Sequence, residues 1–169
     1  YAAMVGLYTA SKTRKLDTRL EYTRVTSWTF NQILPRNRYV NRHDPIGDVI
    51  GNDYDLITAE LIRWFKPNLS ARLELSVKQQ GEGRINDEWT EPWLDIVGDY
   101  NEPFPTGTVE ETKTASVALR GFVNTFLFVD LNAGLSRIIN YDNHAGDRRT
   151  LPFVDCYFSL YFSKILGLD

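Results

Sequence analysis

The sequence predicts an all-β chain folded as an antiparallel, up-and-down transmembrane β-barrel. Three features predict this fold class. Stretches of about ten residues alternate between apolar and polar side chains, which is the period of a β-strand. The connections between these stretches alternate between short and long, and the polar faces carry charges of both signs. We count seven strands in this pattern and expect no helix.

The composition limits the class of protein. With 169 residues the chain is long enough for one domain, and we treat 1–169 as a single barrel domain or a fragment of one. Its 19 basic and 22 acidic residues give a net charge of -3, which does not support a nucleic-acid partner. No run of residues approaches the ~20 apolar positions of a membrane-spanning helix. The single cysteine, Cys156, excludes an internal disulfide.

The clearest strand is the second arm of a hairpin that spans Tyr54–Gln79. Its alternate residues from Leu69 to Val77 are all apolar, whereas the residues between them are polar or charged. A helix would scatter the same leucines around its circumference. The Pro67-Asn68 pair supplies turn chemistry between the two arms.

The other strands show the same alternation and are separated by polar segments. In chain order, the predicted strands cover residues 2–10, 16–30, 54–64, 69–78, 112–121, 127–136 and 153–163. Short turns join them at 11–15, 65–68 and 122–125, and longer loops at 31–53, 81–111 and 142–150. Within the second long loop, residues 94–97 fit a short strand of their own.

Alternation alone does not separate a soluble sandwich from an outer-membrane barrel, because both have a period of two. The loop rhythm favours the barrel, whose short turns are periplasmic and whose long loops are extracellular. Aromatic residues near strand ends suit its interfacial girdles; they are Trp28, Phe30, Tyr54, Trp64, Phe65, Phe126, Tyr141, Phe153 and Phe162. The polar face is expected to line a lumen with Arg19, Glu21, Arg72, Glu74, Lys78, Arg120 and Asp130. The apolar face, which includes Leu73 and Leu75, is expected to meet lipid.

This topology also bears on how much of a barrel the chain contains. If short turns are periplasmic, both the first and the last strand run toward the periplasm. An ascending strand is then expected before Tyr1, since single-chain bacterial barrels have an even number of strands from eight up. The chain therefore fits the C-terminal part of a larger barrel.

Residues 20–56 resemble a recurring segment of the capsule assembly Wzi family. A strand of the Glu-Tyr-Thr type leads through an aromatic pair into an Asn- and Tyr-rich loop with two glycine turns. Here Pro45-Ile46-Gly47 and Ile50-Gly51-Asn52-Asp53 match these turns, with Asn52 where proline is common. Lys-Gln-Gln-Gly-Glu-Gly at 78–83 also looks like the family, whereas residues 163–169 extend past the expected final aromatic. The resemblance implies a large outer-membrane barrel that holds or organises capsular polysaccharide, with lectin-like character.

The long loops hold the candidate ligand-binding residues. Indole faces stack on sugar rings, and carboxylates accept hydrogen bonds from hydroxyl groups. The candidates for polysaccharide binding are Asn41, Arg42, His43, Asp87, Trp89 and Trp93. The plainer interpretation is that they pin the loops over the mouth of the barrel. Neither His43 nor His144 has a Cys or His partner at metal-ligand spacing, and no catalytic motif is present, so we expect no metal, cofactor or enzyme activity.

The leading hypothesis is a non-catalytic outer-membrane barrel protein that acts in polysaccharide assembly or attachment at the surface of a Gram-negative-type bacterium. Its expected partners are outer-membrane lipid and surface polysaccharide. The first alternative is a porin or substrate-specific channel, which an open lumen would favour. The second is a soluble β-barrel carrier of an apolar ligand, which would pack a protein core against Leu73 and Leu75.

Overall fold

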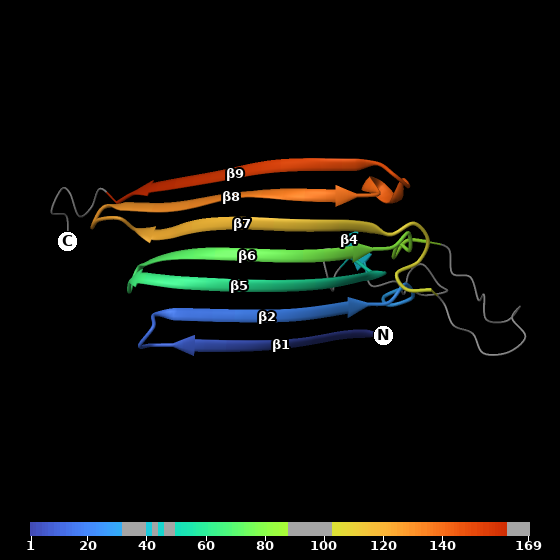
Figure 1. The fold of residues 1–169 in the computed structure, drawn as a ribbon, viewed down its shortest axis with the longest axis horizontal. Coiled ribbons are helices and arrows are strands. Elements are labelled where there is room, and N and C mark those ends of the chain that lie inside the picture. Colours follow the sequence, from blue (N-terminus) through green and yellow to red (C-terminus); the bar gives the residue numbers. More distant parts are fainter. Residues whose placement is uncertain (32–39, 42–43, 46–49, 88–102, 162–169) are drawn as a thin grey trace, which may run out of the picture.

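The computed structural model describes residues 1–31, 40–41, 44–45, 50–87 and 103–161. Seven long strands form one antiparallel sheet in the order β1-β2-β5-β6-β7-β8-β9 (Figure 1). They are β1 (Ala2–Ser11), β2 (Leu16–Val25), β5 (Tyr54–Lys66), β6 (Leu69–Gln80), β7 (Glu110–Phe122), β8 (Leu127–Ile139) and β9 (Arg148–Leu160). A separate two-stranded ribbon joins β3 (Val40–Asn41) to β4 (Asp44–Pro45). The predicted all-β, up-and-down fold is confirmed.

Each long strand pairs with its neighbour along the chain, so short turns and long connections fall at opposite ends of the sheet (Figure 1). The connections at 12–15, 67–68 and 123–126 lie at the short-turn end, and those at 26–53, 81–109 and 140–147 lie at the long-loop end. A 3-10 helix of three residues, Tyr141–Asn143, lies in the last of these. No helix among the described residues is long and apolar enough to cross a membrane.

The continuous register gives the sheet two chemically distinct faces. Leu7, Leu20, Ala59, Leu75, Ala115, Leu135 and Pro152 are paired in one row across all seven strands. We call this side the apolar face and the opposite side the polar face. Leu73 and Leu75 on the apolar face are 40% and 47% exposed, so no core formed by the described residues packs against them. The same face leaves Val5, Ile57, Val117, Val154 and Phe158 exposed.

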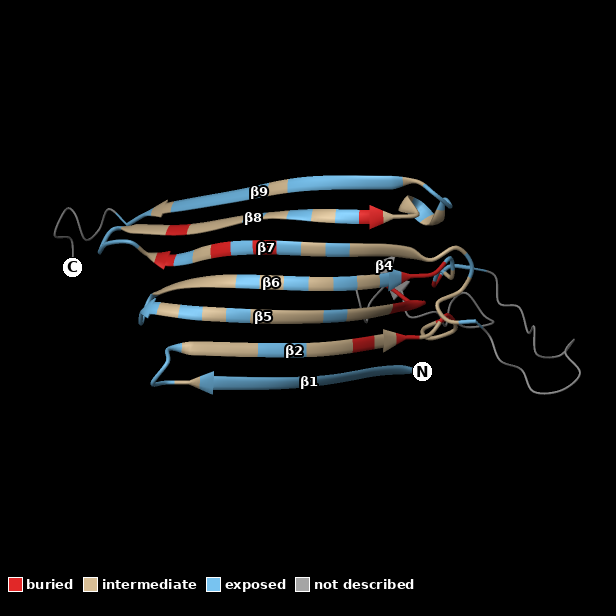
Figure 2. Ribbon diagram, viewed as in Figure 1, coloured by how far each residue is buried: buried red, intermediate tan, exposed pale blue. Residues whose placement is uncertain are grey.

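The most deeply buried residues lie at the long-loop end of β2, β5 and β6 (Figure 2). Tyr54 and Asp53 have no exposed surface, and Asn31 and Asn52 have 1% each. The edge strands β1 and β9 are exposed along almost their whole length (Figure 2). The packed interior of the described part therefore lies under the long connections, not between two sheet layers.

Several predicted strand ends are wrong; β8 extends beyond residue 136 to Ile139, and β9 ends at Leu160, not at residue 163. The strand expected to reach Phe30 ends at Val25, because residues 26–30 turn back with Thr29 N–H donating to Thr26 O at 3.0 Å and with Phe30 at a φ of 68°. The last strand begins at Arg148, not at Phe153, so the connection expected at 142–150 covers residues 140–147 instead. The possible strand at 94–97 lies outside the described residues.

The proposed aromatic girdle is wrong for several of its members. The register places Tyr54 and Trp64 of β5 on the polar face, opposite in direction to Ile57. Trp64 Nε1 donates to Asp17 Oδ2 at 2.8 Å, which holds the indole over that face. Phe153 of β9 pairs with Gly134 on the same polar face. Since alternate residues point to opposite sides of a strand, these rings cannot line the same surface as the exposed leucines.

Arg63 continues the apolar face of β5 at its short-turn end. Its guanidinium donates from Nη1 to the carbonyl oxygen of Arg14 in the 12–15 turn. A long side chain of this kind can lie along apolar surface and place its charge beyond it. Arg63 therefore ends the apolar face without placing an unpaired charge in its centre.

Candidate functional site

The predicted lumen-lining residues share one face. The register places Arg19, Glu21, Arg72, Glu74, Lys78, Arg120 and Asp130 on the polar face. Some of their ion pairs cross between strands: Arg120 Nε lies 3.4 Å from Asp130 Oδ2, and Lys78 Nζ lies 3.6 Å from Glu110 Oε1. Arg19 pairs instead with Glu21 of its own strand. That this face encloses a lumen stays a prediction.

Arg72 occupies a central place on the polar face. Glu60 of β5 and Glu74 of β6 lie directly opposite one another, a pairing of like charges that destabilises a sheet. The Nη1 atom of Arg72 is 3.5 Å from Glu60 Oε2 and 3.7 Å from Glu74 Oε2. A single guanidinium therefore offsets the repulsion between the two carboxylates.

At the long-loop end, Asp53 joins two connections that are distant in the sequence. Its Oδ2 accepts hydrogen bonds from Gly83 N–H at 2.8 Å and from the Thr106 hydroxyl. Thr106 N–H donates to Oδ1 at 3.1 Å, and Gly81 N–H donates to the carbonyl oxygen of Asp53 at 2.8 Å. A buried carboxylate that accepts several bonds holds its donors more firmly than a neutral acceptor would. Asp53 thus fixes the segments after β6 and before β7.

Asn143 provides a second junction. Its Nδ2 donates to the carbonyl oxygens of Gln80 at 3.1 Å and Thr108 at 2.7 Å, and its Oδ1 accepts from Arg84 Nη2. Arg84 Nη1 also donates to Gly81 O at 2.7 Å. These bonds tie the 140–147 connection to the same two segments that Asp53 holds, so three connections are joined over one end of the sheet.

Asn52, which stands in the second glycine turn where proline is common, has a structural role. Its Nδ2 donates to the carbonyl oxygen of Ser27, and its own carbonyl oxygen accepts from Gln80 Nε2 at 2.7 Å. Proline at this position could not donate the side-chain hydrogen bond. Asn52 therefore fastens the turn after β2 to the end of β6.

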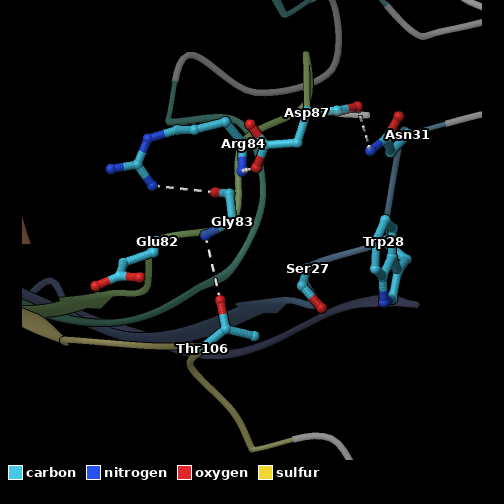
Figure 3. Close-up of a pocket in the computed structure, with 8 residues that line it drawn as sticks. All are labelled: Ser27, Trp28, Asn31, Glu82, Gly83, Arg84, Asp87 and Thr106. Carbon is cyan, nitrogen blue, oxygen red and sulfur yellow. Dashed lines mark hydrogen bonds between the residues drawn. The ribbon is translucent and has the colours of Figure 1, made fainter. Parts of the chain in front are cut away.

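A pocket of about 360 Å³ lies among these connections, and we call it the mouth pocket (Figure 3). It is lined by Ser27, Trp28, Asn31, Glu82, Gly83, Arg84, Asp87 and Thr106. Figure 3 shows Trp28 and Ser27 on one side, with Glu82, Gly83 and Arg84 across from them. The lining thus combines an aromatic ring, two carboxylates, a guanidinium and hydroxyl groups. This is the chemistry that recognises a polyhydroxylated ring, by stacking on its face and hydrogen bonding at its edges.

Glu82 is held in place by the segment before β7. Thr108 N–H donates to Glu82 Oε1 at 2.9 Å, and this backbone hydrogen bond lowers the pKa of the carboxyl below its usual value. Because the pKa is lowered, the stabilisation from the Thr108–Glu82 hydrogen bond is fully present above the ordinary pKa of a glutamate. It is lost as the pH falls through the lowered value. Glu82 therefore faces the mouth pocket as a carboxylate at neutral pH.

Of the six candidate ligand-binding residues, the structure places Asp87 in the mouth pocket. Its Oδ2 accepts from Arg84 N–H at 2.6 Å, and its carbonyl oxygen accepts from Asn31 Nδ2 at 3.3 Å, so it also pins the loop as the plainer interpretation expects. Asn41 lies in β3, where it pairs with Asp44. Arg42, His43, Trp89 and Trp93 lie outside the described residues.

The sequence profile of the family described as capsule assembly protein Wzi matches residues 1–152. The chain belongs to this family. The Wzi proteins act in capsule assembly at the outer membrane of Gram-negative bacteria, and the seven-stranded sheet is consistent with part of their β-barrel. The resemblance seen at residues 20–56 and 78–83 is thereby confirmed. A search of curated proteins finds no match to this Wzi chain, and a search of solved structures finds none.

Apart from Asp87, the lining residues of this Wzi pocket were not among the candidates from the sequence. Three of them, Trp28, Glu82 and Arg84, carry its ring and two of its charges. Trp28 was assigned to a girdle, because an aromatic at the end of an alternating stretch resembles a strand residue. Glu82 and Arg84 lie in or next to the 78–83 motif, at the point where β6 ends. The sequence signal for such pocket residues is their position directly after strands that end on the long-loop side.

Proposed function

We propose that this Wzi-family chain forms part of the wall and the extracellular mouth of an outer-membrane barrel that binds capsular polysaccharide without catalysis. The observation that carries the proposal is the mouth pocket, since it brings Trp28, Glu82 and Arg84 together at the long-loop end. Family membership supports a role in capsule assembly, and the pocket supports direct contact with the sugar chain.

The two faces of the sheet support the placement in the membrane. The exposed leucines, valines and phenylalanines of the apolar face cost nothing toward lipid, whereas in water they would form a large apolar patch. The ion-paired polar face would then line the interior of the barrel. The edges of β1 and β9 carry backbone groups that a membrane does not satisfy, so we propose that further strands pair with them in the closed barrel.

The pocket is built to hold its shape before a ligand arrives. Asp53 fixes Gly83 and Thr106, and Asn143 fixes Arg84, so three lining residues are held through the connections themselves. Preorganised groups lose less freedom on binding than mobile ones. A rigid site at the long-loop end of the sheet suits the capture of a repeating sugar chain.

Replacing Trp28 with Ala is expected to weaken binding of purified capsular polysaccharide by about tenfold, because the aromatic surface for stacking is lost. Binding is measured by surface plasmon resonance on the full-length natural chain in detergent, and retention of capsule on cells is scored in parallel. The matched control is Trp64→Phe, since Trp64 lies on the polar face at the short-turn end. Unchanged binding by the Trp28→Ala protein would remove the mouth pocket from the proposal.

A further inference from the structure

The apolar face carries a groove that is separate from the mouth pocket and has no part in the proposed binding of polysaccharide. It has a volume of about 400 Å³ and lies across β5, β6, β7 and β8. Its lining includes Ile57, Ala59, Leu75, Val77, Lys113, Ala115, Leu135 and Arg137. Ala59, Leu75, Ala115 and Leu135 share one row of the register, so two short alanine side chains alternate with two long leucines. Each alanine leaves space between the larger side chains beside it. The groove follows this space, and its floor is apolar.

One end of this groove is basic. Lys113 and Arg137 lie directly opposite each other on β7 and β8, in the row next to the alanines and on the side of the long loops. Arg148 lies on the same face, diagonal to Arg137 across the β8–β9 pair. Directly opposed like charges destabilise a sheet. An anion bound between Lys113 and Arg137 would reduce this repulsion.

Few acidic groups of the protein meet these cations. Lys113 Nζ is 2.7 Å from Glu111 Oε1 on its own strand. Within the described part of the chain, the side chains of Arg137 and Arg148 form no ion pair or hydrogen bond. The Lys113, Glu111, Arg137 and Arg148 group thus keeps an excess of positive charge at the border of an exposed apolar surface.

We propose that the groove binds a phosphorylated, acylated lipid of the outer leaflet. An acyl chain lies along Leu75, Ala115 and Leu135, and the phosphate group binds between Lys113 and Arg137. A planar guanidinium suits phosphate oxygens, and an alkyl chain fills apolar space without directional demands. The proposal rests on the proposed placement of the apolar face in the membrane, but not on the polysaccharide site.

The probe is bis-phosphorylated lipid A added to the full-length natural chain in detergent, with bound lipid counted by native mass spectrometry. The double variant Lys113→Gln/Arg137→Gln is expected to bind about 30-fold more weakly, from the attraction that each basic residue contributes to an anionic headgroup. Ala115→Leu is expected to weaken binding as well, because it fills the groove. The matched control is Arg63→Gln, a cation of the same face at the opposite end, and it should bind as the natural protein does.

Two further arms separate the chemistry of the ligand. The same lipid without phosphates should bind weakly, and inorganic phosphate at millimolar concentration should not displace the intact lipid. Equal binding of the dephosphorylated lipid, displacement by free phosphate, or full binding by the double variant would each overturn the proposal. Polysaccharide binding measured on the same samples should be unchanged in the double variant, so failure of the lipid site is distinguishable from failure of the mouth pocket.

Discussion

Replacing Asp53 with Ala is expected to release the connections that cover the long-loop end of the sheet. The carboxylate is fully buried and accepts hydrogen bonds from Gly83 N–H, Thr106 N–H and the Thr106 hydroxyl. Alanine would leave these donors without their acceptor, at a cost of about 3 kcal/mol in local stability. Because both segments line the mouth pocket, polysaccharide binding should fall together with their order.

The measurement is hydrogen–deuterium exchange of residues 81–87 and 103–108 in the full-length natural chain. Exchange there should accelerate by about 100-fold for a loss of this size, whereas exchange within β7 and β8 should change little. Asp53→Asn keeps the size of the side chain and one acceptor oxygen, so it should give a smaller effect. Asp155→Ala is the control, since Asp155 is an exposed carboxylate that forms no ion pair within the described residues. Unaltered exchange in Asp53→Ala would show that other contacts hold the connections.

The Gly121→Ala substitution is expected to destabilise the β6–β7 pair by about 3 kcal/mol or more. Gly121 has a φ of 141°, which side chains rarely adopt. A Cβ added there would lie 2.0 Å from the carbonyl oxygen of Asn68, a backbone atom held by Phe122 N–H at 2.8 Å. Relief would require movement of the 67–68 turn itself.

Gly146→Ala is the matched control. Its φ of 86° is also positive, but an added Cβ would meet no atom within 4 Å. It should cost only about 1 kcal/mol, so the difference between the two variants isolates the clash at Asn68. Both are measured by urea unfolding of the natural full-length chain in lipid vesicles. Equal midpoints for the two variants would contradict the steric explanation.

The strands of the sheet could be predicted because period two is visible wherever one face is apolar. The pattern weakens at the ends of the strands. Arg148, Arg149 and Thr150 are polar in sequence, yet they pair with Ile139, Ile138 and Arg137 of β8. Backbone hydrogen bonds continue past the point where the apolar face stops, and the sequence carries no signal for that extension.

The end of β2 shows the opposite difficulty. Residues 25–30 keep an alternation that fits a strand, but Asn52 and Asn31 bind the chain there into a turn through contacts with Ser27 and Asp87. Long-range hydrogen bonds of this kind override the local pattern. The mouth pocket could be predicted only at the level of its loops, because its shape depends on such contacts between separate connections.

The position of Tyr54, in contrast, was accessible from the sequence. Counting from Ile57 along β5 places Tyr54 on the opposite face, where a girdle cannot form. Nearness to a strand end does not determine which side of the strand the ring takes. Parity along the strand is thus a stronger criterion than proximity to its terminus.

The uneven burial along the strands has a consequence for how this family can diversify. Within the described part of the chain, no second layer covers positions such as Leu73 and Val117, so exchange among Leu, Ile, Val and Phe should be nearly neutral there as long as the side chain stays apolar. Around Asp53, Asn52 and Asn143 the hydrogen bonds fix both partners, so a change in one requires a compensating change in another. Under the proposed function, family members that bind different surface sugars should therefore differ by coordinated replacements at the long-loop end. The residues of the apolar face should change one at a time and independently of the loop end.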